Sequence, residues 1–209
     1  MPRKIRSFSS NHELVAERRK QIAKSAARLF VKQGYEKTWV REIGAACGMS
    51  MGTLYHYVGS KKDILYMVID QGMLPLQQFI DKVNSNYLTD SISPIKALES
   101  TVQLLYQTIE QIEDIIAFIY LESKHFENDL LKKGQQIELQ CIEILERLLT
   151  KGCETGEFKI DEIPIVAHNI IVLSHMWVLR KWYFKNRYTF DLYLKEQIKL
   201  LINSIKSEA

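Results

Sequence analysis

Apolar residues recur along most of this chain at intervals of three and four positions, the spacing of one face of an α-helix. Gly34 stands just after residues 13–33, at a position where helices commonly end. The inward face of this first helix has the repeat Ile22, Ala26, Leu29 and Phe30. Only four prolines and nine glycines occur in 209 residues, so little in the chain interrupts long helices. We therefore predict an all-α protein.

Residues 38–62 predict two short helices around a tight turn. The first has one apolar side, formed by Val40, Ile43 and Ala46. Gly48 follows it, where a helix favours a left-handed residue, and Ser50 can then cap the second helix by accepting a backbone N–H. Leu54 and Val58 are four positions apart and face inward. This is the pattern of a helix–turn–helix.

The other face of the second short helix carries donors, acceptors and flat rings that no core of this segment can bury: Met51, Thr53, Tyr55, His56 and Tyr57. A helix–turn–helix whose second helix presents such a face is typical of proteins that enter the major groove of DNA. The pattern favours a nucleic-acid-binding role for this segment.

The remaining apolar periodicity predicts a larger helical body. We expect helices over about 60–86, 94–112, 113–124, 128–154, 163–185 and 188–206. Gly72 and Pro75 are plausible bend points in the first of them, which joins the two parts of the molecule. From these patterns we predict three parts of the chain: a basic flexible arm at 1–15, a three-helix DNA-binding domain at 16–66, and a ligand-binding and dimerisation body at 67–209.

Charge is distributed unevenly behind a net value of +3. Residues 1–62 hold 13 basic and 4 acidic side chains, whereas the rest of the chain holds 15 basic and 21 acidic ones. A basic segment on a mildly acidic body favours a nucleic-acid-binding head. In the arm, Arg3, Lys4 and Arg6 are either phosphate contacts or part of a simple tail, and the sequence leaves both open.

These residues carry a family resemblance. The chain from Ile22 through Leu65 resembles the DNA-binding domain of the TetR family of bacterial regulators, through AARLFVKQGY, T-x-V-R-E-I and G-x-S-x-G-T-L-Y-x-Y-V-x-S-K-x-x-I-L. The detailed match covers about a quarter of the chain, and beyond it only the helical pattern and the length agree. The resemblance implies a ligand-responsive regulator, most simply a repressor, that binds a palindromic operator as a homodimer.

The resemblance also implies which residues meet DNA. Tyr55, Tyr57, Thr53 and Lys61 would contact the backbone, and the full predicted set is Thr38, Arg41, Met51, Gly52, Thr53, Tyr55, His56, Tyr57 and Lys61. Two positions depart from the family. Met51 replaces a common lysine, and Trp39 replaces a common Ser or Thr that caps the second helix, so that Thr38 is the substitute cap. The indole of Trp39 lies either on the sugar–phosphate backbone or on the first helix; the sequence leaves both open.

Two further sites follow from the resemblance. Pairing through the last two helices would use Trp177, Trp182, Phe184, Leu194, Ile198 and Leu201, because these helices have more apolar surface than one body can bury. A cavity in the body would be lined by Leu105, Tyr106, Ile109, Phe118, Tyr120, His125, Cys141, Leu145, Val172, His175 and Met176. Such a mostly apolar lining suits a small hydrophobic or aromatic effector, such as a fatty-acyl compound.

Other classes of protein receive little support. No Walker loop, dinucleotide fingerprint or H-E-x-x-H motif is present, so no enzyme, cofactor or metal is predicted. His168 and His175 are seven positions apart, too far for a simple pair of metal ligands. No apolar run approaches a membrane span, and three cysteines without metal or redox spacing indicate a cytoplasmic protein. The alternative is a helical small-molecule-binding or catalytic protein with a vestigial head.

Overall fold

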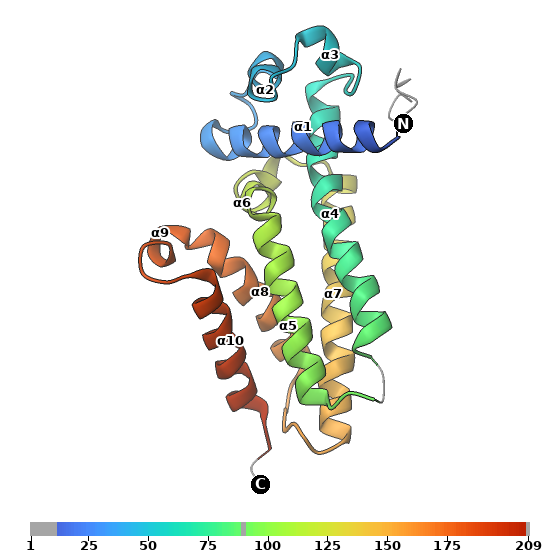
Figure 1. The fold of residues 1–209 in the computed structure, drawn as a ribbon, viewed down its shortest axis with the longest axis vertical. Coiled ribbons are helices and arrows are strands. Elements are labelled where there is room, and N and C mark those ends of the chain that lie inside the picture. Colours follow the sequence, from blue (N-terminus) through green and yellow to red (C-terminus); the bar gives the residue numbers. More distant parts are fainter. Residues whose placement is uncertain (1–11, 89–90, 208–209) are drawn as a thin grey trace. The chain divides into compact units, whose positions relative to one another are not determined.

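The computed structural model describes residues 12–88 and 91–207, and within them the chain is a set of helices (Figure 1). The elements are α1 (His12–Gln33), α2 (Val40–Ala46), α3 (Met51–Tyr55), α4 (Lys61–Asn86), α5 (Pro94–Gln111), α6 (Glu113–Glu122), the 3-10 turn η1 (Ser123–His125), α7 (Asn128–Glu154), α8 (Ile163–Leu179), α9 (Lys181–Phe184) and α10 (Phe190–Ile205). The all-α prediction is confirmed. The arm predicted at 1–15 lies largely outside the described residues.

The helices form two compact units that divide the chain discontinuously. Unit 1 contains the described residues up to Leu74 together with Asp114–Gly134, and unit 2 contains Pro75–Glu113 and the chain from Gln135 onward. The helices α4 and α7 each contribute residues to both units. The predicted boundary at residue 66 falls within α4 and stays a prediction.

In unit 1, three residues of α6 spaced four apart lie against α1 and the turn that follows it. Asp114 accepts a 2.8 Å bond from the Nε of Arg28, Phe118 packs on Phe30 with ring centroids 5.0 Å apart, and Glu122 accepts the backbone N–H of Tyr35. Both phenylalanine side chains are fully buried. Residues at i, i+4 and i+8 share one helix face, so α6 completes the small core that α1 begins.

A second face of α6 meets α4 at close range. A Cβ added to Gly72 would stand 2.8 Å from Cγ2 of Ile115, so a larger residue at position 72 would push α6 away. The glycine that the sequence marked as a bend point is therefore also a point of close approach. Pro75 lies inside α4, which continues without interruption to Asn86.

Polar contacts join α4 to the start of α7 within the same unit. Lys62 pairs with Glu127 at 2.6 Å, and the hydroxyl of Tyr66 donates to Asp129 at 2.9 Å. One turn further along, Asp70 pairs with Lys133. These partners are largely exposed, so each contact stabilises little, but the four-residue repeat fixes the register of the two helices.

In unit 2, α5 packs against α8 and α10 around a cluster of aromatic rings. Trp177 of α8 lies 5.2 Å from the ring of Tyr193 and 6.0 Å from Phe184. The single helix predicted over 163–185 is wrong, because α8 ends at Leu179 and a short α9 follows Arg180. No glycine or proline marks this break; after it, Lys181 bonds both carboxylate oxygens of Glu113 and Phe184 packs on Tyr193 at 4.8 Å.

The end of α10 is tied to the loop after α7. The N–H of Lys159 donates to the carbonyl of Ile205 at 2.8 Å, and Ser207 donates to Glu157 at 3.1 Å. Between these bonds, the buried ring of Phe158 fills the space over Gly152, where a Cβ would overlap it. The missing side chain in α7 thus makes room for the ring that anchors this loop.

Candidate nucleic-acid interface and effector site

The turn between α2 and α3 is built as the sequence predicts. Gly48 has φ +64°, which only glycine adopts freely, and the N–H of Met49 returns to the carbonyl of Gly44 at 2.9 Å. The hydroxyl of Ser50 then caps α3 by accepting the N–H of Thr53 at 3.1 Å. Ile43 and Leu54 are fully buried, and a Cβ added to Gly44 would lie 3.5 Å from Cδ2 of Leu54, so α3 packs on α2 at this glycine.

The start of α2 differs from the prediction. Thr38 is buried and its hydroxyl donates to the carbonyl of Gly34 at 2.8 Å, so it neither caps α2 nor faces outward. The cap residue is Trp39, whose N–H donates to the Glu42 carboxylate at 2.7 Å. Glu42 also accepts from the side chain of Gln33 at 3.1 Å. This carboxylate, three residues into the helix, supplies the Glu half of a capping box, whereas the Trp39 side chain cannot accept the backbone N–H that a Ser or Thr cap would bind.

Most of the predicted DNA contacts lie on the outer surface of this unit. Tyr57 is half-buried, and the residues with exposed positions are Arg41, Met51, Gly52, Thr53, Tyr55 and His56. The hydroxyl of Thr53 also bonds that of Ser50 at 2.9 Å. The exposed face of α3 therefore combines hydroxyl, imidazole, phenol and thioether groups on a helix anchored by Leu54.

Lys61, at the start of α4, is held in place by the segment between α1 and α2. Its ammonium donates to the carbonyl of Glu36 at 3.0 Å and lies 4.4 Å from the ring centroid of Tyr35. Neither contact neutralises a full charge. Burial and the carboxylate of Glu36 raise the pKa of the Tyr35 phenol, which keeps the ring a neutral platform for the cation.

The predicted effector residues are divided between the two units. Phe118 and Tyr120 belong to unit 1, as does His125. Phe118 packs between Phe30 and Phe126, so it is part of the unit 1 core, whereas Tyr120 is 49% exposed. The apolar periodicity of α6 shows that the helix has a buried face, but it does not show which of the two units contains the residues that this face packs against.

The other predicted effector residues lie in unit 2. Val172 and Met176 are half-buried, and the buried members are Leu105, Tyr106, Ile109, Cys141, Leu145 and His175. Burial lowers the pKa of His175 to about 4 and raises that of Cys141 to about 12, and burial also raises the pKa of the Tyr106 phenol. All three side chains are therefore neutral at pH 7, and this interior suits uncharged ligand groups.

Sequence reasoning missed Thr101, one turn before Leu105 on α5. Its side chain is fully buried, and its hydroxyl has no hydrogen-bond partner within the described part of the chain. A buried hydroxyl without a partner costs free energy unless another group satisfies it. A single mid-helix threonine gives no sequence signal of this kind, because most such hydroxyls bond the carbonyl four residues back.

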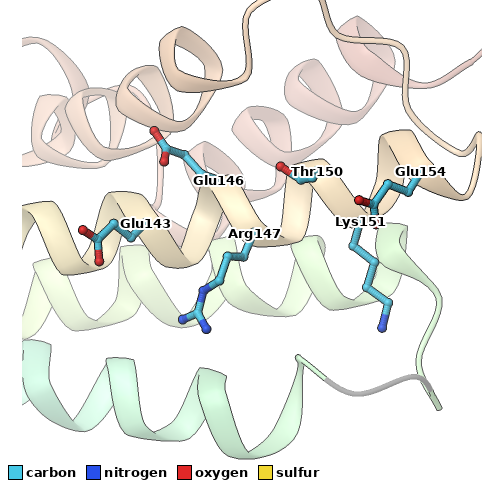
Figure 2. A pocket seen from close by; sticks show the side chains of 6 residues that line it. All are labelled: Glu143, Glu146, Arg147, Thr150, Lys151 and Glu154. Carbon is cyan, nitrogen blue, oxygen red and sulfur yellow. The ribbon is translucent and has the colours of Figure 1, made fainter.

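A surface hollow along α7 has a different character (Figure 2). All its lining residues come from this one helix: Glu143, Glu146, Arg147, Thr150, Lys151 and Glu154. Arg147 also donates to the side-chain oxygen of Asn84 at 2.8 Å. The hollow includes none of the predicted effector residues, and its charged lining does not suit an apolar effector. In the described residues, no group of acidic, histidine and cysteine side chains forms a metal site.

The predicted dimer residues fall into two groups. Trp177 and Leu194 are buried within unit 2 and belong to its own core; Phe184, Ile198 and Leu201 are half-buried, and Trp182 is 69% exposed. The apolar side chains that α8 and α10 do expose are others: Ile165, Leu173, Leu192 and Leu200. The sequence shows that these helices carry two apolar faces, but not which of the two faces the protomer covers itself.

A helix–turn–helix that exposes polar and aromatic side chains, followed by a larger helical region, defines a DNA-binding regulator. Residues 22–66 match the family model for bacterial regulatory proteins of the tetR family, and residues 74–204 match the model for the C-terminal region of YsiA-like proteins. The chain belongs to the tetR family of transcriptional regulators, which confirms the resemblance noted in its sequence. No helix among the described residues has both the length and the apolar character to cross a membrane.

Relatives and solved structures agree with this assignment. The HTH-type transcriptional regulator HbdR of Aromatoleum sp. (strain CIB) is 27% identical over 201 residues, covering 95% of this chain and 85% of HbdR. The repressor KstR2 of Rhodococcus jostii (strain RHA1) is 25% identical over 195 residues, covering 91% and 92% of the two chains.

Two solved structures share the fold at low identity. The ketosteroid transcriptional regulator KstR2 of Mycobacterium tuberculosis superposes with a TM-score of 0.77 at 19% identity, covering 98% of this chain and 100% of KstR2. The structure of AibR in complex with isovaleryl coenzyme A and operator DNA superposes with a TM-score of 0.71 at 21% identity, covering 88% of this chain and 98% of AibR.

Proposed function

We propose that this chain is a cytoplasmic transcriptional repressor that binds an inverted-repeat operator as a homodimer and leaves it when a small apolar effector binds. The observation that carries the proposal is the face of α3, where Thr53, Tyr55 and His56 are exposed while Leu54 anchors the helix inward. Hydroxyls and rings held outward by such an anchor are suited to base edges and the sugar–phosphate backbone. The proposed role requires no catalytic step.

The effector we propose is an acyl-coenzyme A ester with a fatty or aromatic acyl group. A neutral, mostly apolar interior in unit 2 supports the apolar part of this proposal, and the unpartnered hydroxyl of Thr101 offers a donor to a thioester carbonyl. Tyr106 and His175 are further polar residues buried in unit 2. The solved complex of AibR with isovaleryl coenzyme A makes this class the first to try.

The dimer we propose uses the outward faces of α8 and α10. Leu173, at 42% exposed, and Leu200, at 62%, are large apolar side chains that the described protomer leaves in water. Burying apolar side chains is favourable, and a two-fold symmetric homodimer, the commonest kind of oligomer, would bury these faces against each other. Phe184, Ile198 and Leu201 remain part of the proposal because they are incompletely covered.

The test is a selection of bound duplexes from random-sequence DNA, followed by release. We expect enrichment of an inverted repeat, with binding that weakens steeply as salt rises. A fatty or aromatic acyl-coenzyme A ester should then release the selected duplex, while coenzyme A alone should not. Failure to enrich any sequence contradicts the DNA-binding proposal, enrichment of sites without a repeat contradicts the dimer, and release by hydrophilic charged compounds alone contradicts the apolar effector.

Replacing Lys61 by alanine should weaken binding to selected and random duplexes alike. Its ammonium touches a carbonyl and a ring but keeps its full charge, so one phosphate contact would be lost. The slope of log affinity against log salt should fall by about one unit. Lys62 is the matched control, because its ammonium is paired with Glu127. An equal change of slope in Lys62→Ala would mean that the loss reflects net charge and not a contact of Lys61.

A further inference from the structure

The side chain of Trp39 stands in water at the edge of α2. It is 65% exposed, and among the large apolar side chains of the described residues only Trp182 is more exposed. Packing of the indole on α1, one of the two placements that the sequence left open, is therefore wrong. A single exposed apolar residue is common and needs no explanation by itself. The surroundings of Trp39 are what give its exposure a meaning.

The backbone on both sides of this indole is fixed. The N–H of Trp39 is held by the Glu42 carboxylate at 2.7 Å, which Gln33 binds in turn at 3.1 Å. The preceding residue, Thr38, is buried and bonds the carbonyl of Gly34. The indole thus projects from an anchored Cα, and holding it against a partner would cost little additional backbone entropy.

Arg41 supplies a charge beside the ring. Its guanidinium carbon lies 5.7 Å from the indole centroid, within the range of a cation–π contact, and its side chain is exposed. The pair offers a flat apolar face, one N–H donor and a guanidinium fork. Phosphate and deoxyribose along one strand present matching groups, since phosphates accept hydrogen bonds and sugars offer an apolar surface.

The position of the pair fits the same partner. Trp39 and Arg41 lie at the start of the first helix of the helix–turn–helix, which contacts α3. In this motif the second helix enters the major groove while the first crosses the backbone. We propose that Trp39 and Arg41 clamp the operator backbone beside the groove, with the indole packed on a deoxyribose and its N–H donated to a phosphate, and with Arg41 bound to a neighbouring phosphate. This inference rests on the proposed DNA-binding function.

The experiment uses the intrinsic fluorescence of the full chain. Of its three tryptophans, Trp39 and Trp182 are exposed and Trp177 is buried. In a Trp182→Phe background, acrylamide therefore reports mainly on Trp39. We expect the selected duplex to protect Trp39 from quenching almost as fully as Trp177 is protected. In a Trp39→Phe variant that keeps Trp182, the same duplex should leave the quenching unchanged.

Affinity and its salt dependence separate the two members of the clamp. Trp39→Ala should weaken operator binding by about tenfold through loss of a hydrogen bond to a charged group, with an unchanged salt slope because the indole is neutral. Trp39→Phe keeps an apolar ring without the N–H, so its operator affinity should lie between that of the parent protein and that of Trp39→Ala. Arg41→Gln should flatten the slope by about one unit. A melting temperature equal to that of the parent protein checks that each variant is folded.

The outcomes distinguish this inference from the function on which it rests. If the protein selects an operator and depends on Lys61 while Trp39 remains fully quenchable, the clamp is wrong and the proposed function stands. If Trp39 becomes protected without DNA as protein concentration rises, the surface pairs with a second copy and the clamp is again wrong. Absence of any operator would overturn both.

Discussion

Replacing Phe118 by alanine is expected to lower the free energy of unfolding by about 3–5 kcal/mol, the usual range for removing a buried aromatic ring. The side chain is fully buried and lies between Phe30 at 5.0 Å and Phe126 at 5.4 Å. Its loss leaves a cavity where α6 meets α1, so operator affinity should fall as well. Denaturant unfolding followed by circular dichroism measures the first effect, and titration of the selected duplex measures the second.

Leu121→Ala is the control on the same helix. Leu121 is 55% exposed, so truncating it should change the free energy of unfolding by no more than about 0.5 kcal/mol. If Phe118→Ala were as mild as this control, α6 would not be part of the unit 1 core. Phe118 would then return to the set of effector contacts.

Gly152→Ala should destabilise the chain by about 3 kcal/mol, the upper part of the range for overpacking a core. The added methyl group would overlap the ring of Phe158, which is buried and cannot be displaced without exposing it. The neighbouring bonds from Lys159 to Ile205 and from Ser207 to Glu157 would loosen, and with them the end of α10. Thermal unfolding measures the loss, and sedimentation shows whether dimer formation weakens with it.

Gly134 provides the matched change in the same helix. A Cβ at this position meets nothing within 4 Å, so Gly134→Ala should stabilise the protein by up to about 1 kcal/mol through helix propensity alone. If the two Gly→Ala substitutions change the stability in opposite directions, the destabilisation at position 152 comes from overlap with the ring of Phe158. A stabilising Gly152→Ala would show that the ring moves aside at little cost.

Local signals in the sequence were sufficient for the helix–turn–helix. The cap at Ser50, the left-handed Gly48 and the inward Leu54 each depend on residues within a few positions, and all three are confirmed. The helix predicted over 128–154 has the bounds of α7 for the same reason, since its periodicity and end signals are local. Such features need no knowledge of the rest of the fold.

Features set by distant contacts were not predictable in this way. The break at Arg180 accompanies contacts of Lys181 with Glu113 and of Phe184 with Tyr193, partners that no local pattern relates. The hydroxyl of Thr38 bonds a carbonyl within the turn after α1, and the Glu42 carboxylate instead accepts the N–H of the cap residue, Trp39. Trp177 and Leu194, predicted on the dimer surface, are covered by their own protomer because periodicity marks an apolar face without saying what covers it.

The composition of unit 1 has a consequence for protein engineering. Because this unit takes in Asp114–Gly134 as well as the described residues up to Leu74, its core is encoded in two separate stretches of the gene. A hybrid repressor made by exchanging only the first stretch would set a foreign α1 against the native Asp114, Phe118 and Glu122. Transplanting operator specificity into another regulator would therefore succeed more readily if both stretches were moved together, leaving α7 from Gln135 onward to the recipient.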